Sequence, residues 1–446
     1  MAYWKLSNFT SIIHHDSGDT ILYNSFMGAV ALVPKEKFRC LERFISDSIS
    51  ESDLIDPALK ELCQEGFFVS SSQDEYHDVR NLLDYEREKL RYTLVILPHE
   101  NCNFRCTYCY ENFELGRMKP NVVESLKLFI KNNIIGYKTL NVMWFGGEPL
   151  LAKDLVYDLS KTFADYCVQN GVNYISGMTT NGYLLTPDVV SELLNSKITG
   201  FQVTLDGPEE IHDNNRKLYP GGKTYRKILD NLTKMHERPG EFQVRIRVNF
   251  NNKSLPLIEK WFMEEISPLF SKDPRFALSP EYIGKWGGKN DHILDVCDYE
   301  KGTSIKSNFL KNSLKLGFSD AVIKGYLMPH GNVCYASKES SIVVGSDGTV
   351  YKCTVAFNDS FNKVGKITDN GDLVVNQNWD LWTKLEDKDC TLCNNCSFYP
   401  SCQSRKCPKI AIRQKRPVCP MTWQEYETLV RSIADNGYSS KSKHCC

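Results

Sequence analysis

The chain has 446 residues, of which 41% are hydrophobic and 24% are charged, and its formal net charge is −1. This ordinary globular composition excludes a disordered or fibrous protein, and the length allows two to four domains. The near-neutral charge argues against nucleic acid as a partner, because neutralising many phosphates requires a broad cationic surface. No apolar run approaches the roughly 20 residues that a membrane span needs.

The N-terminal stretch lacks the charged region, long apolar run and cleavage site of a signal peptide, so we expect a cytoplasmic protein. Seventeen cysteines are then unexpected, because a reducing cytosol disfavours disulfides. In that compartment a high cysteine count indicates metal or redox chemistry. Three cysteines lie within 102–109 and eight lie between 334 and 419, and this clustering favours metal sites.

Residues 1–80 are expected to form a separate small domain. Two strand-like runs meet around Asn24–Gly28, two helical segments follow, and a short strand closes the domain. The polar helical pattern after it is assigned to a linker helix over residues 81–91.

The pattern then changes to strands that alternate with helices. Strand-like segments lie at 92–98, 139–149, 174–182, 200–207, 242–250 and 275–283. Six such repeats predict a parallel sheet with right-handed crossovers. For residues 92–320 we expect an α/β fold, a partial (β/α)6 TIM-type barrel, rather than an open doubly wound sheet. In such a barrel the chemistry lies on loops at the carboxyl ends of the strands.

Residues 321–425 are turn-rich and dense in cysteine. The segment 341–353 has the pattern of a hairpin around Ser346-Asp347-Gly348. Little here can form a core, so we expect ligand bonds to hold this region together. Residues 426–446 are assigned to a C-terminal helix and a flexible tail.

The first cysteine cluster, in "NCNFRCTYCYEN", follows the first strand of the alternating region. Cys102, Cys106 and Cys109 could be a broken zinc site, a redox pair with a spare thiol, or an incomplete metal cage. A zinc site would need a fourth ligand, either His99 or a distant cysteine. A [4Fe–4S] cube held by three cysteines leaves one iron open to a small molecule, which is the interpretation we favour.

This loop, with Tyr108 before its last cysteine, resembles the cluster loop of the radical S-adenosylmethionine (SAM) enzymes. The resemblance implies that the open iron binds the amino and carboxylate groups of SAM. It also implies that one electron from the cluster cleaves SAM, and that the resulting 5′-deoxyadenosyl radical abstracts a substrate hydrogen. The protein would supply orientation and exclusion.

Two short motifs after later strands resemble the same family. "WFGGEP" resembles the motif whose backbone, at Gly146 and Gly147, meets the SAM amino group, with Glu148 as an acceptor for the ammonium. "TTNG" resembles the strand end that contacts the ribose, through Thr180 and Asn181. An ordinary Gly-Gly turn is the alternative for the first motif.

Two further stretches complete the resemblance. In "VTLDGPEEIHDNNRK", Asp206 is implied to lie near the substrate or ribose and Arg216 near the SAM carboxylate, for which a guanidinium is suited. In "VRIRVNF", Arg247 and Asn249 are implied to lie near the cofactor. Surface or core hydrogen bonding is the alternative for these residues. No catalytic base can be assigned from the sequence.

The second cysteine cluster is longer. Its members are Cys334, Cys353, Cys390, Cys393, Cys396, Cys402, Cys407 and Cys419. Paired C-x2-C units also suit zinc ribbons. The order resembles the SPASM extension of radical SAM maturases, apart from one longer spacing and the extra Cys390.

The SPASM resemblance implies two auxiliary [4Fe–4S] clusters, and hence three in all. One would be held by Cys393, Cys396, Cys402 and Cys419, and the other by Cys334, Cys353 and Cys407. Cys390 would complete the second cage, or that cage would be open at one iron. The sequence leaves both possibilities open.

SPASM enzymes mostly modify peptides or proteins. The N-terminal domain resembles the winged-helix-like recognition element of enzymes that process ribosomally synthesised and post-translationally modified peptides (RiPPs), which capture the leader as an added strand. The implied partners are a precursor peptide and an electron donor such as flavodoxin or ferredoxin.

The resemblance extends to the thioether-forming sactipeptide and ranthipeptide type of RiPP maturase. It implies an oxidoreductase that forms intramolecular cross-links from cysteine sulfur to carbon. Carbon–carbon cross-linking, and oxidation of a Cys or Ser in a client protein as in anaerobic sulfatase maturation, are the alternative reactions. A non-catalytic iron–sulfur or zinc scaffold that binds a peptide is the alternative from another class.

Overall fold

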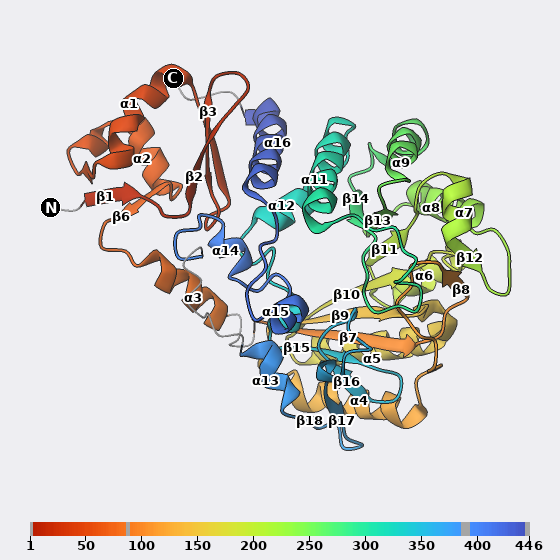
Figure 1. Cartoon of the computed structure of the whole chain (residues 1–446). Helices are drawn as coiled ribbons and strands as arrows, with labels where there is room; N and C mark the ends of the chain where they lie inside the picture. Colours follow the sequence, from red (N-terminus) through yellow and green to blue (C-terminus); the bar gives the residue numbers. More distant parts are fainter. Residues whose placement is uncertain (1–2, 86–89, 385–392, 442–446) are drawn as a thin grey trace. The chain divides into compact units, whose positions relative to one another are not determined.

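The computed structural model describes residues 3–85, 90–384 and 393–441 (Figure 1). The chain divides into two compact units. Of the described residues, the first unit contains 3–85, 320–334 and 393–441, and the second contains 90–319 and 335–384. The cysteine-rich region therefore contributes to both units.

The second unit is built on a ten-stranded sheet. Six of its strands are parallel neighbours, in the order β14-β13-β11-β10-β9-β7. They are β7 (Arg91–His99), β9 (Thr139–Gly146), β10 (Asn173–Thr180), β11 (Gly200–Thr204), β13 (Gln243–Phe250) and β14 (Phe276–Tyr282). These are the six predicted strands, and with their intervening helices they confirm the mixed α/β class.

Helices connect the parallel strands, and helices α4 and α5 pack against each other beside the sheet (Figure 1). Proline opens α4 and α6, where its missing N–H costs no hydrogen bond. The helical elements are α4 (Pro120–Asn133), η3 (Pro149–Ala152), α5 (Lys153–Gln169), α6 (Pro187–Asn195), α7 (Glu209–Asn215), α8 (Tyr225–Glu237), α9 (Leu255–Trp261), η4 (Phe262–Ile266), α10 (Ser267–Phe270) and α11 (Tyr299–Lys315).

The remaining strands of the sheet come from the cysteine-rich region. They are β15 (Ser341–Val344), β16 (Thr349–Tyr351), β17 (Lys363–Ile367) and β18 (Leu373–Val375), with η5 (Tyr335–Ser337), η6 (Ser360–Asn362) and α13 (Asn378–Thr383) around them. The predicted hairpin of β15 and β16 is confirmed. Strand β15 also pairs in parallel with β7, placing buried Ile342 beside buried Leu94. This segment therefore packs onto the sheet of the second unit, whereas we expected little of it to join a core; the expected ligand bonds stay a prediction.

A separate two-stranded ribbon joins the cysteine loop to the chain after α7. Strand β8 (Phe104–Cys106) pairs antiparallel with β12 (Arg216–Leu218), and Arg216 stands opposite Cys106. The sequence analysis did not predict this ribbon, because three-residue strands carry too little periodicity.

The N-terminal part of the first unit has two small sheets, ordered β5-β1-β6 and β2-β3-β4. The predicted hairpin around Asn24–Gly28, the two helices and the closing strand are confirmed, and β1, β2 and β5 are additional. The elements are β1 (Tyr3–Leu6), β2 (Thr10–His14), β3 (Thr20–Asn24), β4 (Ala29–Val33), α1 (Lys35–Ser46), β5 (Ile49–Ser50), η1 (Asp53–Ile55), α2 (Pro57–Gln64), β6 (Phe68–Ser70) and α3 (Glu75–Tyr85).

The rest of the first unit consists of α12 (Ala321–Leu327), α14 (Tyr399–Cys402), α15 (Pro408–Gln414) and α16 (Trp423–Lys441). Helix α16 contacts α12, β3 and β4, and the Tyr23 hydroxyl donates to the Leu327 carbonyl at 2.7 Å. Within the described ranges, none of the helices combines the length and apolar character needed to cross a bilayer. Parts of the predicted linker helix and C-terminal tail, 86–89 and 442–446, lie outside the described residues.

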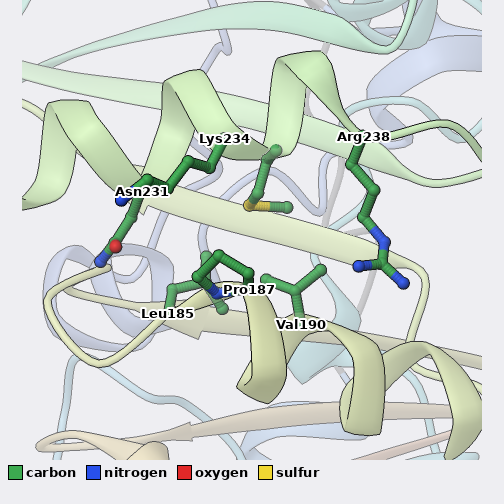
Figure 2. Close-up of a pocket in the computed structure, with 7 residues that line it drawn as sticks. Leu185, Pro187, Val190, Asn231, Lys234 and Arg238 are labelled. Carbon is green, nitrogen blue, oxygen red and sulfur yellow. The ribbon is translucent and has the colours of Figure 1, made fainter.

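A small cavity of about 20 Å³ lies between α6 and α8 (Figure 2). It is lined by Leu185, Pro187, Val190, Asn231, Lys234, Met235 and Arg238. Its volume suits about one water molecule. The side-chain amide of Asn231, on α8, donates to the Gly182 and Tyr183 carbonyls at 2.8 and 3.1 Å. Helix α8 therefore supports the loop that follows β10.

Candidate functional site

The first cysteine cluster lies on the loop that leaves β7, at the carboxyl end of the parallel strands. The Asn101 side chain accepts from the Cys102 N–H at 2.8 Å, and the Cys102 sulfur accepts from the Phe104 N–H at 3.3 Å. The Thr107 N–H donates to the Asn215 carbonyl at 2.8 Å. The loop is thus fixed by backbone hydrogen bonds and by the β8–β12 ribbon.

The three thiols of this loop are close enough to affect one another. Burial, followed by the charge of Glu148 and with a smaller effect of Cys106, raises the pKa of Cys102 to about 12. Burial also raises the pKa of Cys106 and of Cys109, and Cys106 and Cys102 both add to the effect on Cys109. The raised pKa values favour the neutral thiols, so deprotonating all three in this buried loop requires a positively charged partner, which iron can supply.

Among the described residues, no group of three or more His, Cys, Asp or Glu side chains is arranged to hold a single metal ion. An iron–sulfur cube is a different kind of site, because each cysteine binds a different iron. The loop offers three thiols, and the sequence assigns no fourth cysteine to it. Three thiols fit an iron–sulfur cube in which one iron is left available to another ligand.

Gly146 and Gly147 bring the end of β9 against the cysteine loop. The Gly147 N–H donates to the His99 carbonyl and the Glu148 N–H donates to the Asn101 carbonyl, both at 3.1 Å. A Cβ on Gly147 would lie 2.5 Å from the carbonyl carbon and oxygen of Asn101. Gly146 has a φ of 116°, a conformation that favours glycine. The two glycines therefore allow the backbone at the end of β9 to approach the cysteine loop closely, rather than forming an ordinary turn.

We expect Gly147→Ala to lower SAM cleavage about 100-fold, because a displacement near 1 Å at a reacting centre has an effect of that size. The measurement is 5′-deoxyadenosine formation by anaerobically reconstituted protein with equal iron content. Gly221→Ala is the control, since a Cβ there meets no atom within 4 Å. Equal rates in wild type and Gly147→Ala would contradict the role given to this approach.

Glu148 connects the ends of β9 and β10 and is fully buried. Its carboxylate accepts from the Thr180 hydroxyl at 2.8 Å, from the Asn181 N–H at 2.8 Å and from the Leu150 N–H at 3.0 Å. Burial raises its pKa, and the hydrogen bonds from Asn181 and Leu150 oppose that shift. In the structure this carboxylate holds two strand ends together, whereas the sequence analysis gave it only a contact with SAM.

Asn181 reaches from β10 to the cysteine loop. Its amide donates to the Asn103 side chain at 2.7 Å and to the Cys102 sulfur at 3.7 Å. The "TTNG" and "GGEP" motifs therefore meet the same cysteine loop. The sequence analysis predicted a shared location for the two motifs but not these contacts.

Asp206 is the centre of a second group of predicted residues. It is fully buried, and its carboxylate accepts from the Tyr108 hydroxyl and from the Asn249 N–H at 2.9 Å and side-chain amide at 3.1 Å. Arg216 lies 4.0 Å from the carboxylate and donates to the Tyr108 oxygen at 2.9 Å. Arg247 donates to the Asn249 side chain at 2.9 Å.

His212, on α7, is also buried. Its Nδ1 accepts from the Asp206 N–H at 3.1 Å, and burial, followed by the Arg216 charge, lowers its pKa to about 2. A neutral imidazole with one nitrogen occupied by backbone fits a structural role. No base is assigned here.

The ten predicted cofactor residues thus fall into two groups near the carboxyl ends of the parallel strands. The first contains Gly146, Gly147, Glu148, Thr180 and Asn181, which lie against the cysteine loop, and the second contains Tyr108, Asp206, Arg216, Arg247 and Asn249, which are joined by hydrogen bonds. The β8–β12 ribbon joins the second group to the cysteine loop, because Arg216 stands opposite Cys106.

The sequence analysis overlooked Glu111, two residues beyond the last cysteine of the loop. Its side chain is buried, and burial, followed by the charge of Glu100, raises its pKa to about 8. An acidic residue between Tyr110 and Asn112 carries no pattern that distinguishes it from a solvated loop residue, so the sequence held no signal for its burial.

In the first unit, Cys402 lies near enough to three other cysteines of the second cluster for their charges to act on it. Burial, followed by the charges of Cys396, Cys393 and Cys419, raises the pKa of the Cys402 thiol to about 12. The Ser404 hydroxyl donates to the Cys393 sulfur at 3.2 Å. These are the four cysteines that the SPASM resemblance assigns to one auxiliary [4Fe–4S] cluster, and this assignment stays a prediction.

The other predicted ligands are divided between the units. Cys334 and Cys407 belong to the first unit, where the Cys334 N–H donates to the Arg405 carbonyl at 2.9 Å, and Cys353 belongs to the second. Cys390 lies outside the described residues. The assignment of these cysteines to one further cluster stays a prediction.

Comparison with known proteins gives the same location for the chemistry. The family model of the radical SAM superfamily matches residues 96–246. The cysteine-type anaerobic sulfatase-maturating enzyme of Clostridium perfringens is 25% identical over 343 residues, covering 71% of this chain and 89% of that protein. GTP 3′,8-cyclase of Campylobacter jejuni subsp. doylei is 35% identical over 304 residues, covering 66% of this chain and 88% of the cyclase.

A solved structure of native anSMEcpe with bound AdoMet and Cp18Cys peptide shares the fold. Its TM-score is 0.55 at 20% identity, with 78% of this chain and 98% of that one covered. The matched segment 96–246 includes the cysteine loop, both glycines, and the Asp206 and Arg216 positions. On this identity and coverage, the chain belongs to the radical SAM superfamily, a family of enzymes that use SAM and a [4Fe–4S] cluster.

Proposed function

We propose that this enzyme modifies a ribosomally made peptide by abstracting a hydrogen from carbon and forming intramolecular Cys sulfur-to-carbon thioether bridges. The observation that carries the radical SAM part is the meeting of Cys102, Gly147, Glu148 and Asn181 at the ends of three parallel strands. The peptide part is supported by the relatives and by the N-terminal domain.

We assign the SAM-binding cluster to Cys102, Cys106 and Cys109. When bound, the cluster and SAM supply the 5′-deoxyadenosyl radical that abstracts hydrogen. Gly146 and Gly147 keep the β9 end against the cysteine loop, and Thr180 and Asn181 present a hydroxyl and an amide at the β10 end. Arg216, held beside Asp206, supplies a cation for a carboxylate.

A polypeptide substrate is supported by two relatives. One is named a sulfatase-maturating enzyme, and a peptide is bound in the structure of anSMEcpe. The cyclase relative is named for a nucleotide substrate, so the superfamily alone does not identify the substrate class.

The chain also has residues that the anSMEcpe structure does not match. The match covers 98% of the anSMEcpe chain but only 78% of this chain. We assign a leader-binding role to residues 1–80, whose small sheets offer strand edges for an added peptide strand. An electron donor such as flavodoxin or ferredoxin would supply the electron for SAM cleavage.

Thioether formation removes one hydrogen from sulfur and one from carbon as the S–C bond forms. The carbon hydrogen leaves with one electron to give 5′-deoxyadenosine, the sulfur proton goes to solvent, and the second electron passes to an auxiliary cluster. Cys402 and the three cysteines whose charges act on it are our candidate ligands for that electron acceptor.

A second candidate is oxidation of a Cys or Ser in a client protein, and the names of the sulfatase-maturating relatives favour it. This reaction also removes two electrons from the substrate, but it leaves an aldehyde rather than a new ring. Carbon–carbon cross-linking is the third reaction, and an experiment must distinguish its product from those of the other two.

The test is mass measurement of a cysteine-containing peptide, encoded by a short reading frame next to the gene, after co-expression with the enzyme. Thioether formation predicts the loss of two hydrogens per bridge and cysteines that resist alkylation. Carbon–carbon linkage leaves the thiols alkylatable, and client oxidation gives a carbonyl that reacts with hydroxylamine. Either of these two products would overturn the thioether proposal.

A further inference from the structure

Within the first unit, two cysteines of the second cluster pack directly on the N-terminal domain. Phe9 and Val79 of that domain form a buried core with Tyr399, and the partly buried Cys393 and Cys396 pack against this core. Two of the four proposed ligands of the auxiliary cluster therefore lie against the domain to which we assign leader binding.

Hydrogen bonds fix the same contact. The Ser397 hydroxyl shares a hydrogen bond of 2.9 Å with the Ser11 hydroxyl, which in turn contacts the Tyr426 hydroxyl at 2.9 Å. The fully buried Ser25 donates to the Ser397 carbonyl. Ser397 follows Cys396 directly, so side chains of β2 and of the turn after β3 hold the segment that carries Cys393 and Cys396.

Tyr76, on α3, is placed beside these cysteines. Its ring lies 5.1 Å from that of Phe9 and 5.7 Å from that of Tyr399. Its hydroxyl is buried and has no hydrogen-bond partner among the described residues. Cys396 and Cys393 are close enough for their charges to add to the effect of burial in raising the Tyr76 pKa.

We propose that the Tyr76 hydroxyl donates a hydrogen bond to a sulfur of the auxiliary cluster held by Cys393, Cys396, Cys402 and Cys419. The inference rests on the proposed function, which places a cube on these four thiols. A buried hydroxyl is expected to find an acceptor, and a phenol keeps its proton at neutral pH. The ring contacts hold the hydroxyl beside the cysteines, where the cluster sulfurs would be the acceptors.

The consequence is a higher reduction potential for this cluster. A donor to a cluster sulfur stabilises the more negative, reduced state, and hydrogen bonds to the sulfurs are a main determinant of the potential. The Ser404 hydroxyl already donates to the Cys393 sulfur. Tyr76 would add a second hydrogen-bond donor, which comes from the N-terminal domain. The domain to which we assign leader binding would therefore also raise the reduction potential of the cluster that accepts an electron.

The test is Tyr76→Phe in the full-length, anaerobically reconstituted protein. The midpoint potential of each cluster is followed by electron paramagnetic resonance during a redox titration. The wave lost in Cys402→Ala identifies the cluster concerned. We expect Tyr76→Phe to move this wave to a lower potential, to leave the other waves unchanged, and to leave iron content unchanged because the ring is kept.

Two variants serve as controls. Tyr23→Phe removes a buried hydroxyl of the same unit that already donates to the Leu327 carbonyl, so the potential should not move. Ser404→Ala removes the donor that the structure shows, so the potential should fall. An unchanged potential in Tyr76→Phe, with the cluster present, would overturn the inference and leave the proposed function standing. Iron and sulfide sufficient only for the SAM-binding cluster would instead contradict the proposed auxiliary cluster.

Discussion

Cys106→Ala is expected to reduce 5′-deoxyadenosine formation to background, whereas Cys402→Ala retains SAM cleavage but loses the cross-linked peptide. Cys106 lies in the loop at the ends of the parallel strands, opposite Arg216 in the β8–β12 ribbon. Two thiols are too few to hold the cube that binds SAM. Cys402 belongs to the other unit, so its loss removes a ligand of the proposed auxiliary cluster and none of the SAM-binding loop.

The comparison requires both products to be measured in one reaction, 5′-deoxyadenosine by chromatography and the modified peptide by mass. Cys167→Ala is the matched control, because Cys167 is a fully buried cysteine on α5 with no predicted ligand role. It should keep both products. Equal retention of the cross-linked peptide in Cys106→Ala and Cys402→Ala would refute the division of labour between the clusters.

Asp206→Ala is expected to lower the free energy of unfolding by about 3–5 kcal/mol and to abolish SAM cleavage. The side chain of Asp206 is fully buried and that of Arg216 is 6% exposed, and the two are 4.0 Å apart. Removing one partner of a buried ion pair leaves an uncompensated charge, which has a cost of this size. Tyr108 and Asn249 would also lose the carboxylate that orients them.

Denaturant unfolding of the anaerobic protein measures the first effect and 5′-deoxyadenosine formation measures the second. Asp230→Ala is the control, because the Asp230–Lys234 pair on α8 is about half exposed on both sides. Such a pair contributes about 0.3–0.5 kcal/mol. A loss of stability as small as in Asp230→Ala would show that Arg216 does not depend on Asp206.

The residues and approximate positions of the catalytic region were predictable because they follow local patterns. Buried parallel strands are continuous apolar runs, and loops at their carboxyl ends must share one edge of the sheet. For this reason the positions of Gly147, Thr180 and Asp206 near the cysteine loop could be predicted from the pattern, whereas that of Asn249 was implied by the family resemblance. The hydrogen bonds among them could not, because side-chain pairing depends on the register of strands far apart in the sequence.

Three features show where local pattern fails. Strand β15 looked like half of a hairpin, but it also adds to β7 across about 250 residues of chain. The β8–β12 ribbon is too short to have a detectable period. Glu148 was predicted only as a contact of the cofactor, and the structure adds that its carboxylate accepts hydrogen bonds from Thr180 and Asn181. In each case the partner is distant in sequence, so no local signal specifies it.

The sequence by itself determined which ligand types this protein offers. Three closely spaced cysteines, two glycines at a strand end and a later group of cysteines limit the cofactors to those that thiols and close backbone approach can bind. The tertiary structure decided which of these groups meet. It placed Arg216 opposite Cys106, and it packed Cys393 and Cys396 against Phe9, Val79 and Tyr76 of the N-terminal domain. Ligand type is a property of single residues, whereas the environment of a ligand is set by packing between distant segments.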